Sequence, residues 1–596
     1  MHLTFLLIFE LSSEGAVASI CFSESMRTGI CLLTRKWSVA VFLLFLLFPA
    51  ISDAQISDDG VSSVILENEQ QIEDVSAPDH RSDDDFLRRY GSGKVDDVEL
   101  LKRSLQSRIQ RRLVLYANAS ASAGGGPHAP FWFTSNRQGM SSTKNWGVLL
   151  DIGLDGGMRL PDNFVFNYGM EVAVAANYQS DFYFHQMYIE AGYKWFDLSL
   201  GMKERWGELK NPRLSSGSLT WSGNSRPIPQ IRLEIPEFTR MRILGGWFSV
   251  KAHIAYGWYL DSRWRADTEM SYYSGINEDY FYVDKLLYHS KDFFLKFGDT
   301  ERFPLEVTIG LEMHAQFGGT KHFGPNDRIE ELPHGLKAYA GILFPFNVVG
   351  EQGKENGNTL GSWHLAFGLS LNGWKYRAYY EHFFEDHSSM LGIEYKADLN
   401  GQKSFICYGI RRNMLDGLFG LEVNAPEGLP FSNIVFEVLN TRGQSGPVCR
   451  TPWWQGIIPE GVDGIDDYYH HEFYHSYSYY GYSNGSPLLV SPIYNEDGDL
   501  KPKSNRVLSF HLGVDGSISP SFEYRVLATH TTHWGRYYIP FREKEYVTSA
   551  LIECNYRFKR SGWKLGFSLA ADFDSGSLVG NNKGAMLTVS KIWKML

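Results

Sequence analysis

The chain has 596 residues, of which 15% are aromatic and 58 are glycine, and it carries a net charge of −11. Its mean hydropathy of −0.26 argues against a bundle of transmembrane helices. The acidic balance argues against nucleic acid as a partner, because phosphate binding needs a basic surface. Many aromatic and glycine residues in a mildly polar chain suit a large β-barrel, in which only every second strand residue meets lipid.

The first segment in chain order has the features of a secretory leader. The apolar run Val39–Ala50 follows basic residues and precedes the small-x-Ala sequence Ser52–Ala54. A basic region, an apolar region and such a cleavage site define a signal peptide. The apolar run is too short to cross a bilayer as a helix. We therefore predict that residues 1–54 are a leader, with the signal peptide over 26–54.

The next segment, 55–111, is predicted to be a polar, acidic linker. Low apolar content and high charge are typical of disorder. Within it, apolar residues recur at helical spacing over Val95–Leu113, which predicts a short amphipathic helix. We expect this helical or disordered segment to be periplasmic, with the rest of the chain, 112–596, forming a separate β-barrel domain.

From about Arg112 the sequence alternates with period two. In Phe164–Ala175, apolar residues occupy alternate positions, and polar or small residues occupy most of the others. One face of such a strand suits lipid, the other a wet lumen, and a tilted membrane strand needs about 9–11 residues. The same pattern recurs in Phe196–Lys203, Leu305–Gln316, Phe522–Thr529 and Trp563–Asp572.

One complete hairpin can be written out over Trp363–Asp386. Asn372-Gly373 lies between two alternating runs, and both residues tolerate the positive φ of a type I′ turn. This turn predicts that Leu371 pairs with Trp374 on an apolar face. Small residues should then lie opposite large ones on the lumen face.

Short and long links alternate along the barrel region, as periplasmic turns and extracellular loops do in outer-membrane barrels. The pattern predicts an all-β, transmembrane outer-membrane barrel of about 16–18 antiparallel strands. Segment 345–361 breaks the alternation, and segment 441–506 is a candidate for folding into the lumen or capping the surface. The short links are Lys194–Phe196, Pro236–Arg240, Gly298–Phe303, Asn372-Gly373, Asp398–Gln402, Ser519-Pro520 and Arg560–Gly562, and the long ones are 204–227, 260–284, 318–335, 384–390, 441–506, 531–545 and 573–584.

Several of these segments resemble the Wzi-type capsule-assembly family of outer-membrane β-barrels. The resemblance runs from about residue 113 to the C-terminus. It implies a barrel in the outer membrane of a Gram-negative bacterium that binds capsular or exopolysaccharide at the cell surface. It also implies outer-membrane lipid and other capsule export proteins as partners. The motifs are Leu214–Leu233 (LSSGSLTWSGNSRPIPQIRL), Trp363–Asp386, Val438–Pro447, Tyr479–Asn495 and Pro130–Gly139.

Sugar sites combine flat aromatic faces with a few fixed polar groups. Three groups of loop and strand-end residues fit that description, although aromatic residues at strand ends usually form the interface girdle and charged ones often bridge strands. The candidates are Trp221, Asn224 and Arg226; Glu381, His382, Phe384, Glu385, Asp386 and His387; and Arg442, Gln444, Trp453 and Trp454.

Other chemistries have weaker support. The stretch Asp467–His475 contains three histidines that could hold a metal, but it does not read as a helix, so a packed loop is the better interpretation. The carboxylates after Tyr380 could imitate a glycosidase pair, and Asp386–Ser388 has the residue types of a triad without its geometry. We predict no catalytic residue, metal or cofactor, and keep a diffusion porin and an outer-membrane hydrolase as alternatives.

Overall fold

The computed structural model describes residues 6–12, 15–21, 111–160, 164–241, 243–273, 281–298, 302–323, 328–343, 357–385, 393–397, 403–407, 415–444, 449–451, 461–463, 466–559 and 561–594. The chain divides into two compact units, Met1–His80 and Arg81–Leu596. In the first unit, β1 (Leu6–Ser12) pairs antiparallel with β2 (Gly15–Cys21). The predicted signal peptide and linker helix lie outside the described residues, apart from the end of that helix, which belongs to the first wall strand.

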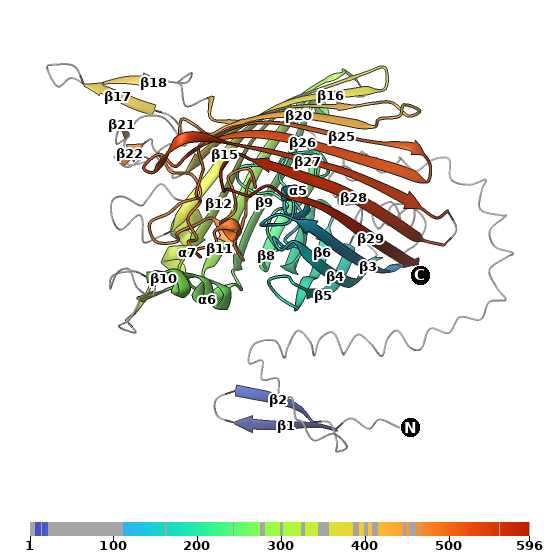
Figure 1. Ribbon diagram of the computed structural model, residues 1–596, viewed down its shortest axis with the longest axis horizontal. Helices are drawn as coiled ribbons and strands as arrows, with labels where there is room; N and C mark the ends of the chain where they lie inside the picture. Colours follow the sequence, from blue (N-terminus) through green and yellow to red (C-terminus); the bar gives the residue numbers. More distant parts are fainter. Residues whose placement is uncertain are drawn as a thin grey trace. The chain divides into compact units, whose positions relative to one another are not determined.

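The second unit is a closed barrel of 18 strands in which every strand is antiparallel to both neighbours (Figure 1). The last strand pairs with the first and closes the wall. The predicted all-β barrel and its strand number are confirmed. The wall strands, in order, are β3 (Arg111–Gly125), β4 (Trp146–Arg159), β5 (Phe164–Ala176), β6 (Phe182–Tyr193), β7 (Phe196–Met202), β8 (Gln230–Met241), β9 (Phe248–Trp258), β11 (Leu287–Phe297), β12 (Leu305–Phe317), β15 (Asn358–Leu371), β16 (Trp374–Glu385), β19 (Gly417–Asn424), β20 (Asn433–Asn440), β25 (Val507–Ser519), β26 (Phe522–Gly535), β27 (Pro540–Arg557), β28 (Trp563–Asp574) and β29 (Lys583–Lys594).

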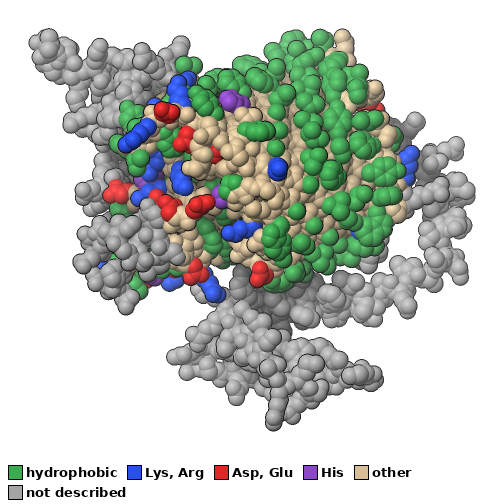
Figure 2. Space-filling view, viewed as in Figure 1, with side chains coloured by type: hydrophobic (Ala, Val, Ile, Leu, Met, Phe, Trp, Pro, Cys, Tyr) green, Lys and Arg blue, Asp and Glu red, His purple; other side chains and the backbone are tan. Residues whose placement is uncertain are grey.

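Alternation along each strand separates an apolar outside from a polar inside. In β4, Leu150 and Ile152 are exposed on the outer surface, whereas Asp151 between them is buried inside. Figure 2 shows the result as a broad field of hydrophobic side chains over the wall, with charged side chains gathered towards one end. A band of exposed apolar side chains on a closed barrel is the surface that a lipid bilayer covers.

The predicted hairpin is present as β15 and β16, in the predicted register. Leu371 pairs with Trp374, and Gly368 pairs with Arg377. Asn372 and Gly373 have φ angles of 52° and 82°, as a type I′ turn requires. The two turn residues therefore predicted correctly which residues of β15 and β16 lie opposite each other.

Connections between wall strands are short at one end of the barrel, the short-turn end, and mostly long at the other, the long-loop end. Figure 1 shows α6, β10 and β17 at the long-loop end and the C-terminus at the opposite end. The small elements within the long connections are α5 (Phe131–Thr134), α6 (Ser262–Tyr273), β10 (Phe281–Asp284), β13 (Thr320–Phe323), β14 (Ile329–Glu331), α7 (Leu336–Leu343), β17 (Ile393–Ala397), β18 (Lys403–Cys407), β21 (Cys449–Thr451), β22 (Gly461–Asp463), β23 (Ser478–Tyr479), β24 (Tyr482–Ser483) and η5 (Pro492–Tyr494), while η2 (Ile243–Gly246) lies in a short turn. Among the described residues, no helix is both long and apolar enough to cross a membrane.

Some link assignments were wrong. Pro236–Arg240 lies within β8, at a register shift between Ile235 and Thr239, because proline is tolerated in a strand at such an irregularity. Asp398–Gln402 lies outside the described residues, and the strands on either side of it, β17 and β18, pair with each other inside a long connection. The expected loop 531–545 is a tight link, since β26 runs to Gly535 and β27 begins at Pro540.

Segment 345–361 does not break the alternation. β15 begins at Asn358, so the residues before it belong to the same long connection as 318–335.

The hydrophobic core of this barrel lies inside its lumen. One cluster joins Phe131, Leu214 and Leu489 from three different connections to wall residues such as Phe383 and Leu527. These connections, 126–145, 203–229 and 466–505, are called the inserted segments below. Of the two alternatives for 441–506, the described part 466–505 follows the first and folds into the lumen.

Candidate functional site

The inserted segment 203–229 is held by carboxylates on the lumen face of the wall. Ser215 Oγ donates a hydrogen bond to Glu437 Oε1 at 2.6 Å, and both the backbone N and Oγ of Ser216 donate to Oε2, at 2.7 and 2.6 Å. Asn211 Nδ2 donates to Glu422 Oε1 at 3.0 Å. This inserted segment therefore supplies donors to acidic side chains on β19 and β20, with its serines bonding to the one on β20.

Glu381, a predicted sugar contact, lies in the same array and is fully buried. Ser218 Oγ and Leu219 N donate to its Oε1 at 2.7 and 2.8 Å. Lys210 Nζ lies 2.9 Å from Oε2 and supplies a buried counter-charge. These partners of the Glu381 carboxylate all belong to the inserted segment, so Glu381 anchors that segment and does not face the outside.

The inserted segment 466–505 lies against the inserted segment 203–229. Tyr469 N donates to Glu385 Oε2 at 2.8 Å, and Tyr469 OH donates to the carbonyl of Leu219. Asn224 Nδ2 donates to the carbonyl of Ser483 at 2.9 Å. Two candidates, Glu385 and Asn224, thus join the two inserted segments to each other and to the wall.

Two further candidates, Trp221 and Arg226, are also buried among aromatic rings. Trp221 Nε1 donates to the carbonyl of Arg205 at 3.3 Å, and its ring lies beside that of His314. The guanidinium carbon of Arg226 lies over the rings of Tyr183 and Tyr480, 3.9 and 4.6 Å from the ring centroids. The cation–π partners of this buried arginine are thus two tyrosines of the protein itself.

Where the inserted segment 466–505 begins, an ion pair joins it to Arg536, in the link between β26 and β27. Asp467 accepts hydrogen bonds from Arg536, and Asn505 Nδ2 donates to its Oδ1 at 2.8 Å. Burial raises the pKa of the Asp467 carboxyl, but hydrogen bonds from His470, Arg536 and Asn505 outweigh it and hold that pKa well below its usual range. Burial also lowers the pKa of His470. We call Asp467, His470 and Arg536 the rim latch.

The other candidates are more scattered. Gln444 is buried and accepts from Tyr468 N at 2.7 Å, so it also holds the inserted segment 466–505. His382 Nδ1 donates to the carbonyl of Asp416 at 2.9 Å, and Phe384 packs against Met313. His471 and His475 take different partners: Phe473 N bonds to the first ring, and Glu269 lies 3.5 Å from the second. Asp386, His387, Trp453 and Trp454 lie outside the described residues.

Arg442 differs from the other described candidates because it is exposed. Its guanidinium lies 5.3 Å from the ring of Trp534, and Lys544 Nζ lies 5.5 Å from the same ring. Arg506 lies 5.1 Å from the neighbouring Tyr537 ring. We call Arg442, Arg506, Trp534, Tyr537 and Lys544 the rim cluster.

The rim cluster lies at the long-loop end, where β26 runs into β27. Trp534 and Tyr537 are not among the predicted binding residues, because 531–545 is predicted as one long loop. The signal was available as WGRYYIPFREK, a stretch of aromatic and basic residues at Trp534–Lys544.

Comparisons with known proteins concern the fold. A scan against models of protein families gives no match, and neither does a search of curated proteins. Among solved structures, Wzi, described as an outer membrane protein involved in group 1 capsule assembly in Escherichia coli and a carbohydrate-binding β-barrel, aligns with a TM-score of 0.49 and 14% identity over 84% of this chain and 89% of that chain. Wzi is therefore one of the solved barrels to which this chain is similar.

Other barrels of known structure align as well. OccK5 (OpdH) of Pseudomonas aeruginosa aligns with a TM-score of 0.40 and 8% identity over 82% of this chain and 99% of that chain. OccD3 (OpdP) of the same organism gives 0.39 and 9% over 82% and 92%. At these identities, the binding properties of this chain have to be argued from its own residues.

Proposed function

We propose that this chain is a non-enzymatic outer-membrane barrel that binds capsular or exopolysaccharide at the cell surface and supports capsule assembly or attachment there. One observation carries the proposal. The motifs Leu214–Leu233 and Tyr479–Asn495, which resemble the Wzi-type family, belong to two of the three inserted segments in the lumen, and these two bond to each other. A lumen occupied in this way supports a role in surface binding over one in free diffusion.

The rim cluster is the proposed contact with polysaccharide. Aromatic faces bind the apolar faces of pyranose rings, while guanidinium and ammonium groups donate to hydroxyl and carboxylate oxygens. Trp534 has two cations beside its ring, and the neighbouring Tyr538 and Ile539 are 67% and 64% exposed. With the long loops extracellular and the N-terminus periplasmic, this cluster would face the capsule.

A binding experiment with a matched control tests this assignment. We expect the detergent-purified barrel to bind polysaccharide isolated from the surface of its own cells, measured by isothermal titration calorimetry. The double variant Arg442→Ala, Trp534→Ala should bind at least about 10-fold more weakly, because it removes a stacking face and a cation. Trp563→Ala is the control, since Trp563 also lies beside a cation, Lys591 at 5.2 Å, but at the short-turn end.

Three outcomes would contradict the proposal. They are a barrel that does not bind the polysaccharide, a double variant that binds like the wild type, and a deletion strain that keeps its surface polysaccharide. Sustained ion conductance in planar bilayers would favour the diffusion porin instead. Turnover of a glycan or lipid that one acidic substitution abolishes would favour the hydrolase.

A further inference from the structure

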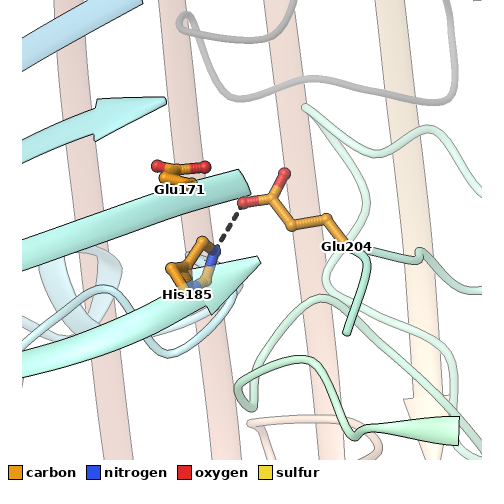
Figure 3. Close-up of side chains that lie close together, drawn as sticks. All are labelled: Glu171, His185 and Glu204. Atoms are coloured by element: carbon orange, nitrogen blue, oxygen red, sulfur yellow. Dashed lines mark hydrogen bonds and ion pairs between the residues drawn. The ribbon is translucent and has the colours of Figure 1, made fainter. Parts of the chain in front are cut away.

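Three side chains with metal-binding groups converge on the lumen side of the wall, away from the rim cluster. Glu171 lies on β5, His185 on β6, and Glu204 just after the end of β7 (Figure 3). All three are buried, and one ligand atom from each lies within 4.8 Å of the other two. His185 Nε2 is 2.7 Å from Glu204 Oε1.

An irregularity in the sheet places the histidine there. Glu171 pairs with Gln186 across β5 and β6, but the next residue, Val172, pairs with Phe184. His185 is therefore the extra residue of a β-bulge, a feature that redirects a side chain at the expense of one ladder pair. Because of the bulge, His185 and Gln186 both reach the carboxylates inside the barrel, whereas Phe184 is exposed outside.

The carboxylates are themselves oriented by a second layer of hydrogen bonds. Gln186 Nε2 donates to Glu171 Oε2 at 2.9 Å, and Gln186 Oε1 accepts from Glu204 N at 3.1 Å. Tyr116 OH also donates to Glu171 Oε2, at 3.0 Å. One amide thus links both acidic residues, which is the outer-shell support that metal ligands commonly have.

We propose that Glu171, His185 and Glu204 bind one divalent transition-metal ion, with Zn²⁺ as the representative. An imidazole with two carboxylates is a mixed nitrogen and oxygen set, which suits Zn²⁺ better than the oxygen-preferring Ca²⁺ or Mg²⁺. Three protein ligands leave a fourth tetrahedral position for water. A divalent ion also offsets two carboxylate charges in a buried place.

The ion would join parts of the chain that are distant in sequence. Glu204 begins the inserted segment 203–229, whereas Glu171 and His185 belong to the wall. A metal bond at this point fixes the base of the segment whose far part is held by Glu381 and Glu437.

The experiment uses the full-length protein in detergent, stripped of metal with a chelator and titrated with Zn²⁺ in a calorimeter. One Zn²⁺ per chain is expected, with Ca²⁺ and Mg²⁺ binding at least about 10-fold more weakly. His185→Gln and Glu204→Gln should each weaken Zn²⁺ binding by at least about 10-fold. His533→Gln should leave it unchanged, because His533 is another buried lumen histidine and bonds to Ser504 instead.

X-ray absorption of the zinc-loaded wild type gives a second, independent result. The expected spectrum has nitrogen and oxygen ligands only, with scattering from one imidazole. A wild type that takes up no stoichiometric Zn²⁺, a first shell containing sulfur or several imidazoles, or folded His185→Gln and Glu204→Gln proteins that bind Zn²⁺ like the wild type would each overturn the proposal. The wild-type result decides the matter even where a variant loses its β circular-dichroism spectrum.

Discussion

At the scale of single residues, the same side chains that looked like ligand contacts hold the protein's own inserted segments. Alternation along β16 puts Glu381 and Glu385 on one face, and in the structure this is the lumen face. It cannot reveal that the partners of Glu381 come from Ser218 and Leu219, some 160 positions earlier in the chain. The anchoring role of Glu437 was not predicted. The usable signal was an acidic residue on the lumen face of a strand in a chain that also has a serine-rich loop.

Glu381→Gln should loosen the inserted segment without opening the wall. The substitution leaves Lys210 buried without its counter-charge, and breaking a buried ion pair costs about 3–5 kcal/mol. Native-state proteolysis should report this as faster cleavage within 204–229. Asp267→Asn is the control, because Asp267 and its partner Arg263 on α6 are both exposed and such pairs contribute about 0–1 kcal/mol. Equal cleavage of the two variants would contradict the anchoring role.

At the scale of elements, local signals predicted the turns of hairpins well. They did not predict whether the paired strands belong to the barrel wall. The Asn372-Gly373 turn was correct because a type I′ turn depends on its own two residues. Asp398–Gln402 also connects two paired strands, but β17 and β18 lie outside the wall, and nothing in the turn distinguishes the two cases. Pro236 was misinterpreted for the same reason, since an irregular strand and a turn both accept proline.

The contact between an inserted segment and a wall strand can be tested at Gly513 on β25. A Cβ there would lie 2.5 Å from the carbonyl oxygen of Leu214, so the segment approaches the wall too closely for a methyl group. Gly513→Ala should therefore displace the segment at a cost of about 1–3 kcal/mol, measured by hydrogen exchange at 211–220. Gly335→Ala should have no such effect, because a Cβ at Gly335 meets nothing within 4 Å. Unchanged exchange in Gly513→Ala would show that the segment can move aside freely.

At the scale of the whole molecule, the barrel was predictable because its constraints repeat. Eighteen strands share one alternation and one order of connections, so single errors did not change the result. The inserted segments inside the lumen do not follow a repeated pattern of this kind. The rim latch, for example, joins Asp467 to Arg536 through a contact that only the folded chain brings together.

Acid should release the rim latch from the wall. The pKa of Asp467 is lowered by its partners in the folded protein, so its contribution is present above its unfolded pKa of about 3.9 and is lost as pH falls through the lower folded value. Burial lowers the pKa of His470 as well, which adds a loss of stability that begins below about pH 6.5. Stability of the latch should therefore be constant above about pH 6.5 and fall on acidification.

Protease cleavage within 466–505, measured with an acid-active enzyme from pH 7 to pH 3, checks this dependence. Asp467→Asn should be cleaved faster than the wild type already at pH 7 and should lose the low-pH part of the dependence. Faster cleavage of the wild type as the pH rises from 4 to 7 would show that the sign is wrong.

The seam between β29 and β3 has a consequence for the order in which the molecule is assembled. Phe131 N donates to Asp572 Oδ2 at 2.8 Å, and His128 N donates to Asn582 Oδ1 at 2.9 Å. The donors follow the first wall strand, whereas both acceptors belong to the last hairpin. The inserted segment 126–145 can therefore bond to its partners only after β28 and β29 have formed. The last part of the wall and this part of the interior are therefore completed in the same step.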